Sequence, residues 1–251
     1  MQRALCAVFA HPDDETFSIG GSLARYSAEG IACHLYVATD GNAGKSSSVP
    51  VSGPAELGLV RRQELHEAAR VLGVTSVRAA GHPDGGLATV SEATLLSEIV
   101  DFLREHRPEV VVTFGPEGAP NGHADHKTIG RLATRAFELA ARADAFPEQV
   151  AQGRSPHAPR RLYYITFGPF PEGSRAKVRQ GLPATARVDV RAWLPQKHGA
   201  FEAHRSQHVH REVFETLSLL PAEDYALAAG EPQPAPLIDD LFAGMGRRSS
   251  D

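Results

Sequence analysis

The sequence contains few of the residues that mark secreted and membrane proteins. It has two cysteines, Cys6 and Cys33, each within an apolar, strand-like run. We therefore expect two buried thiols in a reduced compartment rather than a disulfide. No apolar run approaches the ~18 residues that are needed to cross a bilayer. The acidic residues that begin at Asp13 come too early for a secretory signal peptide, so the sequence predicts a cytoplasmic protein without a membrane partner.

An excess of positive charge is also absent. The 26 lysines and arginines are outnumbered by 30 aspartates and glutamates, which gives a net charge of -4. This balance provides no electrostatic reason to expect a nucleic acid as a partner. The length of 251 residues, 42% of them hydrophobic, suits a single soluble domain with a substantial core.

Short β-branched runs alternate with longer amphipathic segments in the first half of the chain. The expected strands span 4–10, 31–39, 74–80 and 109–115. The expected helices span 18–29, 55–72, 91–106 and 123–143. This alternation predicts an α/β fold with a Rossmann-like, mostly parallel sheet and helices on both of its faces. Such sheets bind ligands where loops leave the carboxyl ends of the strands.

The second half of the chain is less regular. We expect strands at 161–168 and 186–190, with one helix over 191–210. From Pro221 onward several prolines predict a loop that crosses the surface before a short element at 237–242. The chain is therefore predicted to be a single domain. Its parts are a Rossmann-like core over 1–145 and an elaborated C-terminal extension over 146–251 that completes the site.

The strongest chemical signal is the run A-H-P-D-D-E at 10–15, directly after the first expected strand. Imidazole and carboxylate both suit Zn²⁺, and a catalytic zinc site needs three protein ligands and one open position for water. Pro12 restricts its own backbone and that of His11, which stiffens the turn. The alternative is that Asp13 and Asp14 only cap the following helix. The histidine and proline in front of them favour metal chemistry.

A second motif, G-H-A-D-H at 122–126, follows the fourth expected strand and opens the next helix. Such a run offers one imidazole as a metal ligand, a second as a charged or hydrogen-bonding group, and a carboxylate that orients an imidazole. The alternative is a solvated helix start at which Asp125 favours the helix dipole. Because the two motifs follow two strands of one sheet, we expect them to form a single site.

In this order the motifs resemble the PIG-L/LmbE family of zinc-dependent N-acetylglucosaminyl deacetylases. The resemblance covers most of the chain. Further matching pieces are T-D-G-x-x-G at 39–44, R-x-x-E-L at 61–65, G-H-P-D-G-G-L at 81–87 and K-H-G-A-F-E-A-H-R-S-Q at 197–207. The family often has proline where this chain has Ala124. That departure keeps the implied ligands but makes the loop less stiff.

The resemblance implies a metal centre and a base. His11, Asp14 and His126 would be the ligands of one zinc ion per chain, with other divalent metals as alternatives. Asp13 would be the general base that takes a proton from the attacking water.

Further roles carry over in the same way. His123 would stabilise the oxyanion of the tetrahedral intermediate, and Asp125 would hold an imidazole in orientation. Arg61, Asp84 and His204 would contact the substrate.

The implied reaction is removal of an N-acetyl group from an N-acetylglucosaminyl-type small molecule. Precursors of sugar-linked thiols such as bacillithiol or mycothiol are candidates at the level of the family, which also often forms homotrimers or hexamers. An amidase that acts on a larger acyl group or a thiol conjugate is the main alternative. A non-catalytic sugar-binding protein is another, although the complete ligand set and the base argue against it.

A rival from another class comes from residues 39–46, T-D-G-N-A-G-K-S, which nearly match a phosphate-binding P-loop. That motif requires glycine where Thr39 stands and a helix that begins at the lysine–serine pair. The prolines and glycine over 50–54 oppose such a helix, so a nucleotide-binding ATPase is the remote alternative. Two histidines farther along, His208 and His210, are interpreted as structural.

Overall fold

The computed structural model describes residues 2–46, 48–168, 170 and 178–246. In these residues one sheet has the strand order β3-β2-β1-β4-β5-β7-β6. Neighbours among the first five strands in the chain pair in parallel, whereas β7 runs antiparallel to both β5 and β6. The strands are β1 (Ala4–Phe9), β2 (Ala32–Thr39), β3 (Ser76–His82), β4 (Val110–Thr113), β5 (Arg161–Thr166), β6 (Ala186–Asp189) and β7 (Ala222–Gly230).

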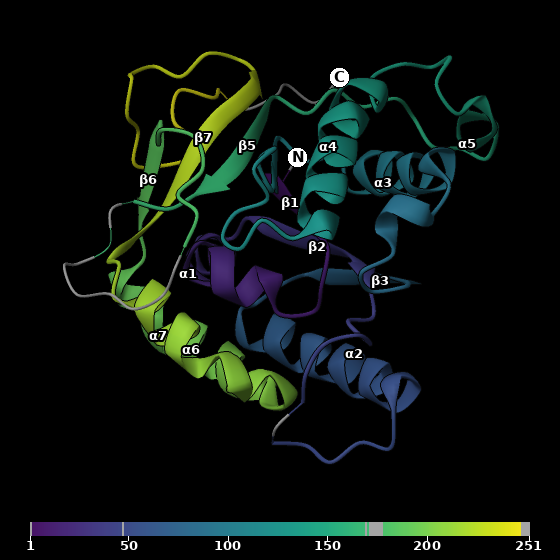
Figure 1. Ribbon diagram of the computed structural model, residues 1–251. Helices are drawn as coiled ribbons and strands as arrows, with labels where there is room; N and C mark the ends of the chain where they lie inside the picture. The colour runs from purple at the N-terminus through teal and green to yellow at the C-terminus, as the bar shows by residue number, and fades with distance from the viewer. Residues whose placement is uncertain (1, 47, 169, 171–177, 247–251) are drawn as a thin grey trace.

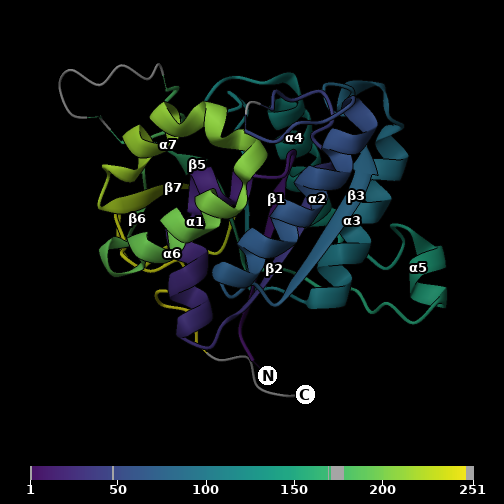
Figure 2. The same ribbon diagram turned by 90° about the horizontal axis from the view of Figure 1, so that it is seen from below.

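Helices cover both faces of this sheet, as Figure 1 shows. On one face α3 packs against α4; on the other, α6 packs against both α1 and α2, an arrangement that Figure 2 presents from below. The helices are α1 (Asp14–Ala28), α2 (Pro54–Val71), α3 (Glu92–His106), α4 (Ala124–Leu139), α5 (Pro147–Ala151), α6 (Leu194–Ala203) and α7 (Arg211–Ser218). The predicted fold class, a mostly parallel α/β sheet between helical layers, is confirmed.

The strand order positions the site. From β1 the chain moves outward through β2 and β3, then returns to place β4 on the other side of β1. This reversal leaves a crevice at the carboxyl ends of β1 and β4, where open α/β sheets bind their ligands. Both strands are fully buried, because their side chains face helices on either side. The first histidine motif begins directly after β1, and the second lies at the end of the loop that connects β4 to α4.

The surface loop expected from Pro221 onward begins later than predicted, because only residues 231–237 are irregular and largely exposed. Residues 222–230 form β7, which lies between β5 and β6. Two carboxylates and several alanines make this segment a weak strand former. The carboxylates are stabilised by partners far away in the sequence. Glu223 accepts a hydrogen bond from Lys197 at 2.7 Å, and Asp224 pairs with Arg187 at 2.7 Å.

The single helix expected over 191–210 is also interrupted. In its place α6 lies between two 3₁₀ segments, η2 (Arg191–Trp193) and η3 (Arg205–His210), and α6 ends at Ala203 with His204 as its C-cap residue. The backbone of His204 leaves the helical region at φ −79° and ψ 57°. Among the described residues, no helix has the length and apolarity that crossing a membrane requires.

Candidate active site

A cavity of about 400 Å³ opens at the carboxyl ends of β1 and β4. Its walls combine both histidine motifs with residues from the C-terminal part of the chain. The lining residues that carry polar side chains are His11, Asp13, Asp14, Ser18, Arg61, Asp84, Asn121, His123, His126, Gln207 and His210. Both sequence motifs therefore contribute to one concave surface.

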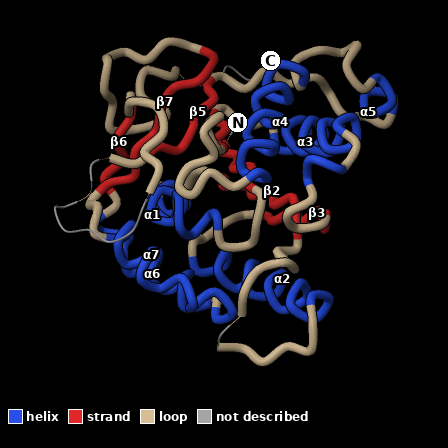
Figure 3. Tube along the Cα trace, viewed as in Figure 1, coloured by secondary structure: helices blue, strands red, loops and turns tan. Residues whose placement is uncertain are grey.

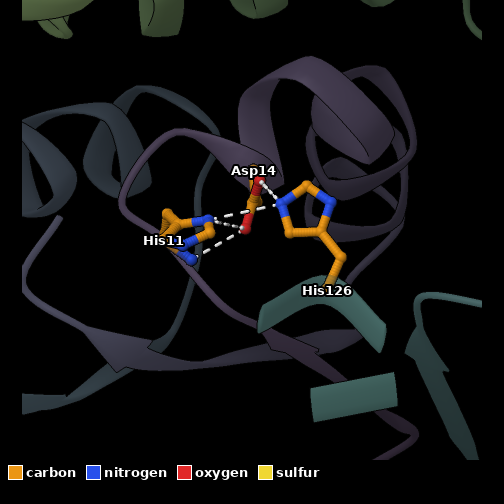
Figure 4. Close-up of side chains that lie close together, drawn as sticks. All are labelled: His11, Asp14 and His126. Carbon is orange, nitrogen blue, oxygen red and sulfur yellow. Dashed lines mark hydrogen bonds and ion pairs between the residues drawn. The ribbon is translucent and has the colours of Figure 1, made fainter. Parts of the chain in front are cut away.

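Three buried side chains that line this cavity, His11, Asp14 and His126, point toward one another, as Figure 4 shows. The Nδ1 atom of His11 lies 3.3 Å from Nε2 of His126 and 3.5 Å from Oδ2 of Asp14. Asp14 Oδ1 lies 3.2 Å from the same His126 nitrogen. Although burial opposes its ionisation, the two imidazoles lower the pKa of Asp14 well below its usual range. Two ring nitrogens and a carboxylate thus face one small volume.

The outer atoms of these side chains are held by other groups. His11 Nε2 lies 3.0 Å from an oxygen of Asp84 and 3.3 Å from an oxygen of Asp125, and His126 Nδ1 lies 3.3 Å from the carbonyl oxygen of Ala119. Because these partners accept hydrogen bonds, they favour the proton on the outer nitrogen of each ring. The inner nitrogens then present their lone pairs, as metal-binding histidines do.

The spacing of the donors fits a metal ion. Tetrahedral ligands about 2.0–2.2 Å from a zinc ion lie about 3.3–3.6 Å from one another. The two inner imidazole nitrogens lie 3.3 Å apart, and each lies 3.2–3.5 Å from one of the two Asp14 oxygens, which is close to this spacing. A second group, formed by His11, Asp84 and His123, also lies within 4.8 Å. It is less buried, because Asp84 and His123 are only partly buried. The first group is the better candidate metal centre.

Asp13 stands beside this centre in an unusual backbone conformation. Its φ of 117° lies in the left-handed region, which residues other than glycine rarely adopt. One carboxylate oxygen lies 3.1 Å from Nη2 of Arg61. Burial raises the pKa of Asp13 to about 6, although the Arg61 guanidinium lowers it. A carboxylate of this kind can accept a proton near neutral pH.

His123 precedes α4 and faces the cavity. Its Nδ1 accepts a hydrogen bond of 3.1 Å from the backbone N–H of Asp125, as an N-cap residue does. Burial lowers the pKa of His123, and the nearby rings of His11 and His126 lower it further. The neutral ring therefore carries its proton on Nε2 and can donate one hydrogen bond from that atom.

Arg61 is buried and already has several partners. Its guanidinium donates hydrogen bonds to the carbonyl oxygens of Pro12 and Gly41 and forms an ion pair with Asp13, so it connects the loops after β1 and β2. Gly41 has a φ of 66°, and a Cβ there would lie 2.4 Å from Nη1 of Arg61, which makes glycine necessary at this position. The buried Nε of Arg61 has no hydrogen-bond partner among the residues that the structure describes.

The structure places the remaining predicted residues unequally. Asp84 lines the cavity, and Asp125 lies below it against His11. His204 is fully buried, pairs with Glu15 and does not appear in the cavity wall. His210, interpreted from the sequence as structural, lines the cavity.

Several cavity residues were not predicted. Phe17, Asn121, Gln207 and Val213 line the cavity but have no motif that marks them as functional. Gln207 lies within the family-like run at 197–207, which is the one available signal for it.

The P-loop alternative is wrong. Residues 40–46 and 48–53 contain no helix, and α2 begins only at Pro54. Figure 3 draws the stretch between β2 and α2 as a long loop. The helix N-terminus that would face a nucleotide phosphate is therefore missing at the lysine–serine pair.

Comparisons with known proteins agree with this geometry. The family model described as PIG-L, GlcNAc-PI de-N-acetylase, matches residues 6–137. The chain is 31% identical to the 1D-myo-inositol 2-acetamido-2-deoxy-alpha-D-glucopyranoside deacetylase of Rhodococcus jostii, over 98% of this chain and 99% of that one.

Solved structures share the fold. The N,N'-diacetylchitobiose deacetylase of Pyrococcus horikoshii matches with a TM-score of 0.75 and 19% identity, over 90% of this chain and 84% of that chain. The 4-carboxy-2-hydroxymuconate hydratase of Pseudomonas putida matches with a TM-score of 0.70 and 18% identity, over 93% and 98%. Because deacetylases and a hydratase share it, the fold alone does not define the reaction. The family match and the near full-length identity confirm the resemblance seen in the motifs: this chain belongs to the PIG-L family of de-N-acetylases.

Proposed function

We propose that this protein is a zinc-dependent N-deacetylase that removes the acetyl group from an N-acetylglucosaminyl-type small molecule. The observation that carries the proposal is the convergence of His11, Asp14 and His126 beside Asp13 in one cavity. The curated relative from Rhodococcus jostii is named as a deacetylase of a 2-acetamido-2-deoxy-glucopyranoside of inositol, which supports an N-acetylated amino-sugar substrate. Sugar-linked thiol precursors are accordingly the first substrates to test.

The three inner donors, two nitrogens and one oxygen, are borderline ligands that suit zinc. A zinc ion held there would lower the pKa of a bound water toward 7 and would polarise the acyl carbonyl. Asp84 and Asp125 orient His11, the Ala119 carbonyl orients His126, and the ionised Asp14 neutralises part of the cation's charge.

The chain's own residues would handle the proton and the oxyanion. Asp13 takes a proton from the attacking water, and the same proton is then available for the leaving amine. Nε2–H of the neutral His123 donates to the oxyanion that forms on the acyl group, a type of contact worth roughly 3–4 kcal/mol in other acyl-transfer enzymes. Arg61 and Asp84, both in the cavity wall, are proposed contacts of the sugar hydroxyls.

The proposal is tested by measuring metal content together with acetate release. The purified protein is expected to hold about one zinc per chain, and to release acetate from N-acetylglucosamine glycosides until a chelator is added. Restoration of activity by zinc after dialysis is the control against damage by the chelator. Bound metal without acetate release would point to a larger acyl group, and a protein that takes up no divalent metal would overturn the proposal.

The C-terminal portion would complete the site and set the preference for the aglycone. Val178 and Val213 from this portion line the cavity, as does Phe17 of α1. We expect an aryl aglycone to pack there, because burying an apolar group of this size contributes about 1.5 kcal/mol.

Val213→Asp is therefore expected to raise KM for an aryl N-acetylglucosaminide by about tenfold, the change that 1.4 kcal/mol produces. KM for the methyl glycoside, which lacks the apolar group, should change by less than about twofold. Val209→Asp is the matched control, since Val209 is 42% exposed and lies outside the cavity wall. Equal effects on both glycosides would remove Val213 from the aglycone site. Steady-state kinetics on the two substrates provides the measurement.

A cytoplasmic location and a homotrimeric or hexameric assembly complete the proposal. The location is supported by Cys6 and Cys33, which are free and buried, as thiols of a reduced compartment are. The assembly is supported by the family resemblance alone, and sedimentation of the purified protein would measure it.

A further inference from the structure

A second buried pair lies behind the candidate metal centre. Glu15, in the first turn of α1, and His204, where α6 ends, both have 0% exposed surface. His204 Nε2 lies 2.7 Å from Oε1 of Glu15. The other ring nitrogen of His204 has no hydrogen-bond partner among the described residues, so Glu15 is the one residue there that hydrogen-bonds the ring. The pair connects the A-H-P-D-D-E motif to a helix nearly two hundred positions later in the chain.

The carboxylate of Glu15 has a second contact, toward the cavity. Its Oε2 accepts a hydrogen bond of 3.0 Å from the backbone N–H of Asp13, while Oε1 faces His204 and the Thr16 hydroxyl. One oxygen is thus anchored by His204 and Thr16, and the other holds the peptide nitrogen of Asp13. If the Glu15 carboxylate moved, the backbone of Asp13 would lose this hydrogen bond or move with it.

Asp13 needs such a restraint because its conformation is strained. A non-glycine residue at φ 117° persists only where the surroundings hold it in place. Arg61 restrains the side chain of Asp13 through an ion pair, and it also holds the carbonyl oxygen of the preceding residue, Pro12. The backbone nitrogen of Asp13 is restrained by Glu15. Side chain and backbone are therefore fixed by different partners, both buried.

We infer that Glu15 and His204 are positioning residues, which hold Asp13 at the distance from the metal centre that proton transfer requires. This inference rests on the proposed function and deepens it. Neither residue lines the cavity, so neither contacts the substrate. His204, expected from the family resemblance to contact the substrate, would act through Glu15 and Asp13 instead.

The inference is tested first by kinetics on the full-length, metal-loaded protein. Glu15→Ala is expected to lower kcat by about 100-fold, because a displacement near 1 Å of a reacting group costs that much. KM should stay within about twofold, since the substrate contacts remain, and the metal content should be unchanged. Glu15→Gln should recover most of kcat, because its amide oxygen can still accept from the Asp13 N–H.

Tyr225→Phe is the matched control. The Tyr225 hydroxyl, fully buried, forms a 2.6 Å hydrogen bond with Ser22, so it also joins α1 to the C-terminal part of the chain but does not reach Asp13. This variant should lower Tm and leave kcat within about twofold of wild type. If Glu15→Ala and Tyr225→Phe lower Tm alike and neither changes kcat, the pair is only structural and the inference is overturned.

A spectroscopic measurement keeps the inference separate from the activity. In the wild-type protein the amide proton of Asp13 should resonate downfield, because a carboxylate accepts its hydrogen bond. His204→Gln, which shortens the anchor, should shift this resonance and accelerate its exchange with solvent; Tyr225→Phe should do neither. An unchanged Asp13 resonance in His204→Gln would overturn the inference even in an active enzyme. Absence of deacetylase activity in wild type, by contrast, would overturn the proposed function alone.

Discussion

Asp13→Asn is expected to reduce kcat by about a thousandfold while about one metal ion per chain is retained. General-base catalysis contributes about 10²–10⁴ in rate, and the asparagine amide cannot accept the proton. The replacement has almost the same shape, and its side-chain oxygen can still accept from Arg61 Nη2, which lies 3.1 Å from Asp13. The metal should remain because Asp13 is not one of the three converging donors. Single-turnover kinetics and elemental analysis measure the two quantities.

Asp40→Asn provides the matched control for this variant. Asp40 carries a carboxylate in the loop after β2, where it pairs with Arg62 at 2.6 Å, and it does not line the cavity. Its replacement should leave both turnover and metal content near wild type. Loss of the metal in Asp13→Asn would show that the two adjacent aspartates have exchanged the roles assigned to them.

The second large effect concerns the metal. His126→Ala is expected to lower metal affinity by more than about 100-fold, since removal of even an outer-shell partner costs 10–100-fold. His126 is 3% exposed, and its ring stacks on Phe114 at 3.9 Å. The variant therefore loses a ligand and also leaves a cavity against Phe114, so Tm should fall as well. Acetate release should disappear together with the metal.

Competition with a chelating dye measures the affinity of this variant. His66→Ala is its control, because His66 is an exposed histidine on α2 that belongs to neither candidate metal group. If His126→Ala held zinc as tightly as His66→Ala, His126 would leave the ligand set. The group formed by His11, Asp84 and His123 would then be the candidate centre.

The Rossmann-like half of the fold could be predicted because its information is local. Buried parallel strands are continuous apolar runs, and each is followed by a helix of recognisable period. The six strands expected from the sequence all occur, with ends that differ by one or two residues. The missed β7 depends on Lys197 and Arg187, whose pairing with its carboxylates is visible only after folding. No local pattern distinguishes a paired carboxylate from a solvated one.

The site divides in the same way. The two histidine motifs could be assigned to one cavity because the carboxyl ends of parallel strands lie on one edge of the sheet. The pairing of His204 with Glu15 could not be predicted, because in the sequence Glu15 is simply another acidic residue at the start of a helix. Gln207 and Val213 line the cavity because the chain changes direction at His204, where α6 ends. The hydrophobic period of the sequence does not indicate that this helix ends there.

The position of β7 between β5 and β6 has a consequence for the order in which the protein is made. Among the described strands, β6 pairs only with β7, although it is synthesised more than thirty residues earlier. A nascent chain that has emerged as far as residue 210 already contains both histidine motifs and His204, but its β6 has no neighbour to join. Folding of the last third of the sheet must therefore wait until the ribosome has released residue 230. A truncation before Ala222 would delete β7, and β6 would then lack the strand with which it pairs.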